Sequence, residues 1–478
     1  MFNLAKKKVL IISFLFLFTL FSINKNLEKK SIEANQRSSN CEPSFKTEKS
    51  LISERFEFYY YLKSLLSKFN EISLPKNVSK PIKIDPIKLI LDILYRNSAF
   101  LTDPDILTER LDSRLDDKNI ILKGYFNSEK EKMIYFGIRF EFLNDFIQDI
   151  SKNAVNCFVS KIERNFYDLK IVSSIAIRCD HLVFQISIFY PRGNFYWISK
   201  DNFGLNSIKK DFNKKDRAFN RFELNGHEEN NIFLSLPADI KKFLFEYAHS
   251  EFVECNYEMA SNLEKDKFNQ DKRKNMFFTT KMIHFKNIID SFQKDYWLAA
   301  GTLLGWYRHC GIIPFTTDID VGMDGDKYDP LIESKFTNDK ILPLSVKFGL
   351  DNDSLGLRLG NKVVTLGISF NYEINTTHLF FPYHSQREVK GVILRKIESL
   401  CSAELFDEKY TIPCNPIKYF EDVYGINGWQ YPQEKFKTSP FLIHWKKWSI
   451  SEWQNAIKFF HNGIYLKEET ERFIKSYS

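Results

Sequence analysis

Hydrophobic and polar positions alternate most clearly in the segment 297–323, which reads WLAAGTLLGWYRHCGIIPFTTDIDVGM. Its last residues, Asp-Ile-Asp-Val-Gly-Met, predict a β-strand that buries its aliphatic side chains and leaves Asp318 and Asp320 on the opposite, open face. Before this strand, an apolar run ends at Gly301-Thr302, and a short helical turn follows. We therefore expect a glycine turn to lie next to a strand that carries two carboxylates.

Apolar runs elsewhere predict a second region of mixed α and β structure. Stripes at helical spacing favour helices over Leu51–Phe69 and over about 277–294. Runs of β-branched and aromatic residues between polar turns indicate strands over 120–122, 133–142, 171–177 and 182–190. The charged segment 261–276 marks the boundary between an N-terminal α+β domain, residues 51–260, and a C-terminal α/β domain, residues 277–478. The first contains no catalytic constellation and suits structural support or partner binding.

The N-terminus contains one membrane-like run, VLIISFLFLFTLFSI at residues 9–23. A helix of this length spans about 22 Å, enough for a thin membrane. Lys6, Lys7 and Lys8 favour a cytoplasmic N-terminus, and no small-residue cleavage pattern follows. We expect residues 1–26 to form a cytoplasmic tail and anchor, residues 27–50 a flexible stem, and the rest a lumenal type II ectodomain. A cleaved signal peptide is the alternative.

Composition and charge narrow the class of protein. The 478 residues are 44% hydrophobic and include 46 Phe and 22 Tyr, which excludes a disordered chain. The net charge of +7 is dispersed, and no arginine-rich or aromatic-interleaved basic motif indicates a nucleic-acid partner. Three glycosylation sequons, at Asn77, Asn352 and Asn375, are compatible with a lumenal glycoprotein.

The seven cysteines are too few for a disulfide scaffold and contain no metal-binding C-x-x-C pair. A hairpin turning at Asp407-Glu408 would place Cys401 opposite Cys414, close enough for a disulfide. Asp-Glu is a poor turn dipeptide, however, and Pro413 lacks a ladder N–H. The sequence leaves a bridge and two free thiols as open alternatives.

The glycine turn and the paired carboxylates together favour phosphate chemistry. Asp318 and Asp320 are spaced to hold one divalent cation, Mg²⁺ or Mn²⁺, which binds oxygen ligands and phosphates. Gly301 and Thr302 could donate hydrogen bonds to a pyrophosphate, and Arg308, on the following helix, could clamp phosphate. The alternatives are a solvated turn for the carboxylates, a helix cap for Gly301-Thr302 and a surface salt bridge for Arg308.

These motifs resemble those of the LicD-type phosphotransferase family. The resemblance rests on Gly301-Thr302-Leu303-Leu304-Gly305-Trp306-Tyr307-Arg308, Ile312-Ile313-Pro314 and Asp318-Ile319-Asp320-Val321-Gly322. Downstream segments resemble the fukutin branch of the family: Leu400-Cys401-Ser402-Ala403-Glu404, Ile412-Pro413-Cys414, Tyr419-Phe420-Glu421-Asp422-Val423-Tyr424-Gly425 and Ile450-Ser451-Glu452-Trp453. The similarity covers roughly residues 277–465.

The resemblance implies a nucleotidyltransferase-like domain on a Golgi (or ER) membrane protein. Members of the family transfer an alcohol phosphate from a CDP-activated donor onto a glycan. In the fukutin branch the transferred group is ribitol 5-phosphate, and the acceptor is the O-mannosyl glycan of a dystroglycan-type protein. The family also implies that Asp326 matches an acidic position after the metal-binding strand.

One position departs from the family pattern. Members carry a third acidic residue on a later strand, in a pattern similar to Leu-Asp-Val-Phe-Phe, whereas this chain has Gly367 there. Asp324, Asp326 and Glu373 are the carboxylates that could complete the site. Without one of them, the cleft lacks a metal ligand or a general base. Two hypotheses follow: a metal-dependent phosphotransferase, or an inactive relative that binds glycan or assists other glycosyltransferases.

Overall fold

The computed structural model describes residues 86–112, 132–153, 157–167, 169–179, 181–201, 214–229, 232–265, 272–360, 364–385, 387–432 and 439–477. Every described residue belongs to one compact unit, Leu51–Ser478. The expected anchor, stem, helix 51–69 and strand 120–122 lie outside the described ranges. Across these ranges, the helices are too short or too polar to span a bilayer.

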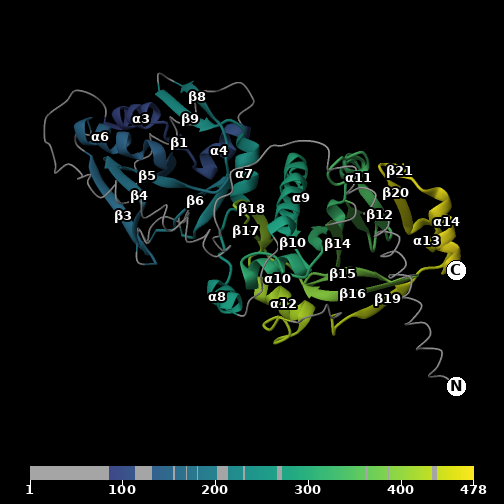
Figure 1. Cartoon of the computed structure of the whole chain (residues 1–478). Coiled ribbons are helices and arrows are strands. Elements are labelled where there is room, and N and C mark those ends of the chain that lie inside the picture. The colour runs from purple at the N-terminus through teal and green to yellow at the C-terminus, as the bar shows by residue number, and fades with distance from the viewer. Residues whose placement is uncertain are drawn as a thin grey trace, which may run out of the picture. The chain divides into compact units, whose positions relative to one another are not determined.

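The N-terminal half of the described chain forms one mixed sheet with helices packed against it (Figure 1). Its strands run in the order β3-β4-β5-β2-β1-β9-β8, with β6 pairing to β5 and to β7. The strands are β1 Phe100–Leu101, β2 Lys132–Arg139, β3 Phe158–Phe166, β4 Leu169–Cys179, β5 Leu182–Arg192, β6 Phe195–Ile198, β7 Arg217–Asn220, β8 Leu224–Glu229 and β9 Ile232–Pro237. The helices are α3 Pro86–Arg96, α4 Pro104–Asp112, α6 Leu143–Asn153 and α7 Ile240–Ala248, with a 3-10 turn at Phe140–Phe142.

Strands β4 and β5 form the buried centre of this sheet. Nearly every residue of both strands is buried, which explains why their sequences are largely apolar and do not alternate, because strands covered on both faces need apolar residues on both. The predictions of strands at 171–177 and 182–190 are confirmed, and the predicted strand 133–142 ends at Arg139, where the 3-10 turn begins. Most of the buried hydrophobic residues belong to one cluster running from Ile90 to Phe252.

The charged segment 261–276 contains more helix than its sequence suggests. Helix α8, Tyr257–Lys265, ends within it, and helix α9, Lys272–Ser291, begins before it ends. The prediction of a helix over about 277–294 is therefore confirmed with an earlier start. A second hydrophobic cluster, from Cys255 to Trp429, begins just after the first one ends.

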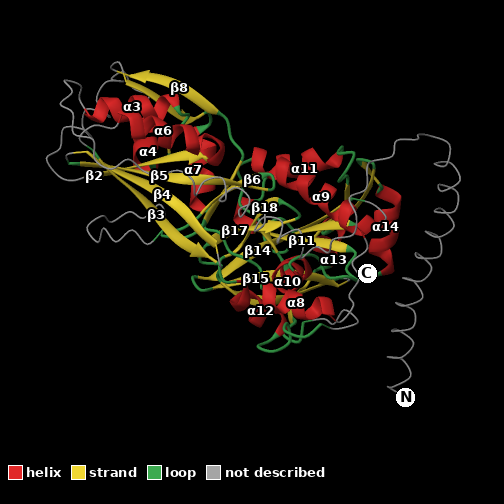
Figure 2. Ribbon diagram, turned by 60° about the vertical axis from the view of Figure 1, so that its left-hand side comes forward, coloured by secondary structure: helices red, strands yellow, loops and turns green. Residues whose placement is uncertain are grey.

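The C-terminal half contains a second mixed sheet, shown with its helices in Figure 2. Its main path is β19-β16-β15-β14-β13-β12-β20-β21, and β14 also pairs with β11, which pairs with β10. The strands are β10 Trp297–Leu298, β11 Asp318–Asp324, β12 Leu344–Phe348, β13 Gly356–Leu359, β14 Thr365–Asn375, β15 His378–Ser385, β16 Glu388–Arg395, β19 Ile443–Lys447, β20 Ile457–His461 and β21 Ile464–Tyr465. A separate hairpin joins β17 Leu400–Leu405 to β18 Glu408–Pro413. The helices are α10 Ala300–His309, α11 Pro330–Thr337, α12 Pro416–Tyr424, α13 Ile450–Asn455 and α14 Lys467–Ser476, with a 3-10 turn at Gly325–Lys327.

Strand β14 is the centre of this sheet around the predicted site. Its first half lies between β11, to which it runs parallel, and β13, to which it runs antiparallel. Ile319 and Val321 of β11 are buried, as are their β14 partners Leu366 and Ile368. Because side chains alternate along a strand, Asp318 and Asp320 lie on the opposite face of the sheet. The predicted strand and its alternation are confirmed.

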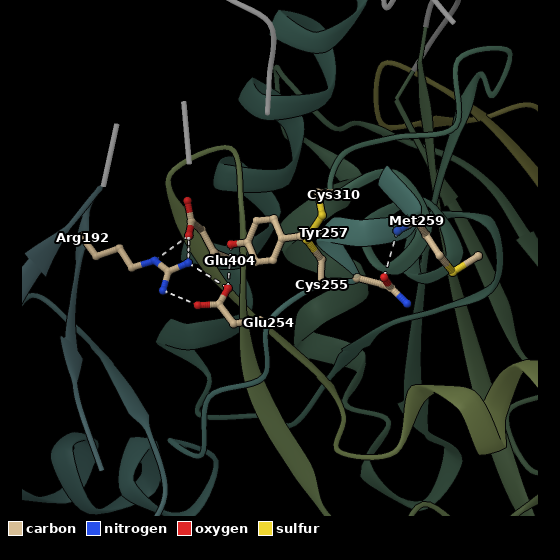
Figure 3. The surroundings of a disulfide bond; sticks show 8 residues. Arg192, Glu254, Cys255, Tyr257, Met259, Cys310 and Glu404 are labelled. Carbon is tan, nitrogen blue, oxygen red and sulfur yellow. Dashed lines mark hydrogen bonds and ion pairs between the residues drawn. A yellow bond between two sulfur atoms is a disulfide. The ribbon is translucent and has the colours of Figure 1, made fainter. Parts of the chain in front are cut away.

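Three disulfides connect six of the seven cysteines, and Cys41 lies outside the described ranges. They join Cys157 to Cys179, Cys255 to Cys310, and Cys401 to Cys414. Figure 3 shows the second bond, which attaches the segment before α8 to the C-terminal end of α10. The sequence pointed only to the third pair, as one of two alternatives.

The Cys401–Cys414 bond forms in a different register from the predicted one. Phe406 and Asp407 make the turn with positive φ angles, so Leu405 pairs with Glu408 and Cys401 faces Ile412. The predicted turn at Asp407-Glu408 is wrong because Glu408 is buried and belongs to the strand. Its carboxylate accepts hydrogen bonds from Lys286 at 2.9 Å and from Asn194 at 2.6 Å. A polar side chain held in this way cannot turn outward.

Candidate active site

The candidate site lies where the start of helix α10 meets strand β11. Strand β10 pairs antiparallel with β11, and the chain then enters α10 at Ala300. The backbone N–H of Ala299 donates to the Asp320 carbonyl at 3.0 Å. The first helical turn is therefore fixed directly beside the two predicted carboxylates.

Gly301 and Thr302 both bind Asp320. The Gly301 N–H donates to Asp320 Oδ2 at 3.2 Å, and the Asp320 N–H donates to the Thr302 hydroxyl at 2.8 Å. Thr302 is buried. The sequence predicted that both residues donate to a pyrophosphate, and the alternative was a helix cap. In the structure Gly301 contacts the Asp320 carboxylate and Thr302 contacts the Asp320 backbone, so both hold this residue in position. Binding of a pyrophosphate by the same two residues stays a prediction.

Asp318 is held by the loop that precedes β11. The Thr316 hydroxyl donates to Asp318 Oδ1 at 2.8 Å. Burial and the neighbouring charge of Asp318 raise the pKa of Asp320 to about 7, although the Gly301 N–H and the Arg358 charge act in the opposite direction. Two carboxylates that repel each other in this way are stabilised when a cation lies between them.

The two carboxylates fit a divalent cation. Each uses one oxygen for the hydrogen bonds above, which leaves Asp318 Oδ2 and Asp320 Oδ1 as available oxygen ligands. Hard cations such as Mg²⁺ commonly use one or two carboxylates and complete their coordination with water and substrate phosphates. In the described part of the chain, no group of three or more His, Cys, Asp or Glu ligands includes this pair. The one such group among the described residues includes Cys401 and Cys414, which are joined in a disulfide.

Position 367 lies directly beside Asp320. In the parallel pairing of β11 with β14, Asp320 is the partner of Gly367, so a third carboxylate at this position would face the pair. A Cβ atom added to Gly367 would meet only Ile319 O at 3.9 Å and Asp320 Oδ1 at 4.0 Å. The glycine therefore leaves open space in the site, and packing does not require it.

The three carboxylates that could replace the missing acid have other surroundings. Asp326 and Glu373 form ion pairs with Lys327 and Lys396, each at 3.1 Å. Asp324 ends β11, where burial and the nearby carboxylates raise its pKa. None of them belongs to a cluster with Asp318 and Asp320 in the described ranges.

Arg308, the predicted phosphate clamp, lies in the last turn of helix α10. Its side chain is buried at the end of α10, and its guanidinium donates to the Trp429 carbonyl at 2.8 Å. Burial lowers its pKa to about 10. The alternative of a surface salt bridge is wrong, because the side chain is buried. The phosphate clamp stays a prediction. Helix periodicity placed Arg308 correctly on α10 but gave no information on the segment that covers it.

Two further residues of the site were missed in the sequence. Tyr419 of α12 accepts a hydrogen bond from the Ala300 N–H at 3.2 Å, so it holds the helix start from the other side. Arg358 of β13 is the antiparallel partner of Gly367. The alternation of Leu357, Arg358 and Leu359 could have placed this arginine on the open face, but nothing in the sequence indicates which strand is its neighbour.

Comparison with known proteins gives matches over the same region. Residues 293–402 match the family model described as LicD/FKTN/FKRP, nucleotidyltransferase domain. Ribitol-5-phosphate transferase FKTN of Mus musculus is 32% identical over 309 residues, which are 61% of this chain and 66% of that protein. The proteins of the same name from Homo sapiens and Macaca fascicularis are each 28% identical, over 85% of this chain and 95% of theirs.

This chain is a fukutin-like member of the LicD family. The segment that matches the LicD model contains α10, β11, β13 and β14, and therefore Asp318, Asp320, Arg358 and Gly367. Tyr419 lies beyond that segment but within the fukutin-like part of the chain. The family resemblance seen in the sequence is confirmed.

Proposed function

We propose that this fukutin-like chain transfers ribitol 5-phosphate from a CDP-activated donor to an O-linked glycan of a dystroglycan-type glycoprotein. The proposal rests on one observation above all: Asp318 and Asp320 lie side by side on β11, next to the α10 turn, in a chain similar to ribitol-5-phosphate transferases over most of its length. Transfer forms a bond from an acceptor hydroxyl oxygen to the ribitol phosphorus. The phosphorus–oxygen bond to CMP breaks, and CMP leaves.

Each residue of the site has a defined task in this reaction. A bound divalent ion, held by Asp318, Asp320 and the donor phosphates, would neutralise charge as the leaving group departs. Gly301 and Thr302 keep Asp320 in place, and Tyr419 keeps the start of α10 in place. A site held by such rigid supports needs little reorganisation when the donor binds.

The location of the protein is part of the proposal. Residues 9–23 would anchor it in the Golgi (or ER) membrane as a single-pass type II protein, with the site in the lumen. The partners would be the CDP-alcohol donor, the glycoprotein acceptor and other glycosyltransferases.

Gly367 supports a second candidate function. A site with two acidic residues lacks the group that would deprotonate the attacking hydroxyl, and such assistance is worth about 10²–10⁴-fold in rate. The second candidate is an inactive relative that binds the glycan or assists other glycosyltransferases. Because a Cβ atom at position 367 meets no close contact, Gly367→Asp is the substitution that tests this.

A transfer assay separates the two candidates. The purified chain is incubated with CDP-ribitol and an O-mannosyl glycopeptide, and the ribitol phosphate added to the peptide is measured by mass spectrometry. We expect transfer that needs Mg²⁺ or Mn²⁺ and that falls at least about a hundredfold in Asp318→Asn and Asp320→Asn. Glu468→Gln, which alters an exposed carboxylate of α14 outside the site, is the control. Transfer by Gly367→Asp alone, with none by the unaltered chain, would assign the second function.

A further inference from the structure

Arg358 occupies a position in the site that the proposed function has not used. It pairs with Gly367 on β14, and Gly367 pairs with Asp320 on β11, so the three residues form one row across three strands. Side chains of directly opposed residues lie on the same face of a sheet. With neighbouring strands about 4.8 Å apart, the Cα atoms of Asp320 and Arg358 are about 10 Å apart. An extended arginine side chain covers most of that distance.

The residue between them has no side chain to fill the space. A Cβ atom at Gly367 would meet no atom closer than 3.9 Å, so the surface between Arg358 and Asp320 is open. The positive charge of Arg358 already lowers the pKa of Asp320, against the larger effects of burial and Asp318. The guanidinium of Arg358 therefore exerts an electrostatic effect on the Asp320 carboxylate, with Gly367 lying between them.

Arg358 is also available to bind a ligand. Its side chain is exposed, and its guanidinium has no ion pair or hydrogen bond with any residue of the described ranges. Leu357 and Leu359 on either side are buried, which fixes the face on which Arg358 lies. A guanidinium on a rigid strand presents its donors in a planar fork that matches phosphate oxygens.

We propose that Arg358 binds the phosphate groups of the CDP-activated donor, over the open position at Gly367, as a fixed positive charge beside the metal-binding pair. The inference rests on the proposed function. A third carboxylate at position 367 would instead be the direct cross-strand partner of Arg358 and would form an ion pair with it. Gly367 and Arg358 therefore act together. Compared with a site that has a third carboxylate at position 367, this site has one negative charge fewer, and the guanidinium of Arg358 supplies a positive charge beside that position.

Calorimetric titration with CDP tests the proposal, in Mg²⁺ and again in EDTA. Charge-assisted hydrogen bonds are roughly twice as strong as neutral ones, so Arg358→Ala should weaken CDP binding about tenfold or more under both conditions. Arg358→Lys should retain part of the affinity. Cytidine, which has no phosphate, should bind both proteins equally. Arg472→Ala, an exposed arginine of α14, should bind CDP as the unaltered chain does.

A double-mutant cycle locates the action of the guanidinium. Arg358→Ala should cost much less CDP affinity in a Gly367→Asp background than in the unaltered chain, because the new carboxylate already occupies the guanidinium. In a Gly367→Asn background, which adds similar volume without charge, the full cost should remain. If Arg358→Ala costs the same CDP affinity in the Gly367→Asp and Gly367→Asn backgrounds, the guanidinium does not act over position 367 and the proposal is overturned.

Three other results also overturn the proposal: undiminished CDP binding by Arg358→Ala, an equal loss for cytidine, or no CDP binding by the unaltered chain. Failure of the proposed function would look different. In that case CDP binding would depend on Arg358 as described, and the transfer assay would show no product.

Discussion

At the residue scale, the site depends on the environment of one carboxylate. Asp320 accepts a hydrogen bond from Gly301 and donates its own N–H to Thr302, and it lies beside Asp318. The sequence predicted both carboxylates and their shared face from alternation alone. It did not predict that Gly301 and Thr302 would contact Asp320, because no pattern in the sequence reports which group a backbone N–H will meet.

Asp320 makes the stability of the metal-free protein dependent on pH. Burial and Asp318 raise its pKa from 3.8 to about 7, so the folded state binds this proton more tightly than the unfolded chain does. The stability that comes from the proton is complete below about pH 4 and is lost as the pH rises through 7. In EDTA, Asp320→Asn should raise the melting temperature by about 2–4 °C at pH 8, the effect of about 1 kcal/mol. The difference should be smaller at pH 5 and should disappear only below about pH 4. If the gain in melting temperature of Asp320→Asn over the unaltered chain is no larger at pH 8 than at pH 5, the environment assigned to Asp320 is wrong.

At the scale of elements, helix α10 is held along its whole length by its neighbours. Its start contacts Asp320 and Tyr419, its middle packs against the following loop, and its end is joined by the Cys255–Cys310 disulfide. The sequence predicted a short helical turn here. It could not predict the length or the packing, because Arg308 and the covering Trp429 are far apart in the chain.

Gly305 provides the closest approach of α10 to its loop. A Cβ atom there would lie 2.9 Å from Ile313 N and 3.0 Å from Gly311 O, both backbone atoms that cannot move aside independently. Gly305→Ala should therefore destabilise the protein by about 1–3 kcal/mol in urea unfolding, although alanine favours helices by about 1 kcal/mol. Gly367→Ala is the matched control, because a Cβ atom at that glycine has room. Equal stability of the two variants would refute the close contact.

At the scale of the whole described chain, a buried ion cluster links residues of the two sheet-containing halves. Arg192 of β5 binds Glu404 of β17 at 2.6 Å and Glu254 at 2.7 Å, next to the Cys255–Cys310 bond (Figure 3). Arg192 and Glu404 are nearly inaccessible to solvent. The sequence indicated two regions and a boundary between them. The sequence did not indicate this link. Charged residues that are far apart in the chain could form many different ion pairs, and no pattern in the sequence selects among them.

Loss of Arg192 should affect both regions together. Arg192→Ala leaves Glu404 buried without its cation, a change that typically costs about 3–5 kcal/mol. Urea unfolding monitored by tryptophan fluorescence should show this loss. Lys170→Ala, which removes an exposed ion pair with Glu163, should cost less than about 1 kcal/mol. Similar small losses in the two variants would show that the cluster contributes little to stability.

The parallel pairing of β11 with β14 has a consequence for how the protein folds. After β11 the chain forms α11, β12 and β13 before β14 returns to lie beside it. Contacts between residues distant in sequence form slowly, because a long loop must close before the pairing stabilises it. Asp320, Gly367 and Arg358 therefore come together only when this closure is complete. During refolding, donor binding should appear only after most helix has formed, and it can serve as a direct signal that β11, β14 and β13 have paired.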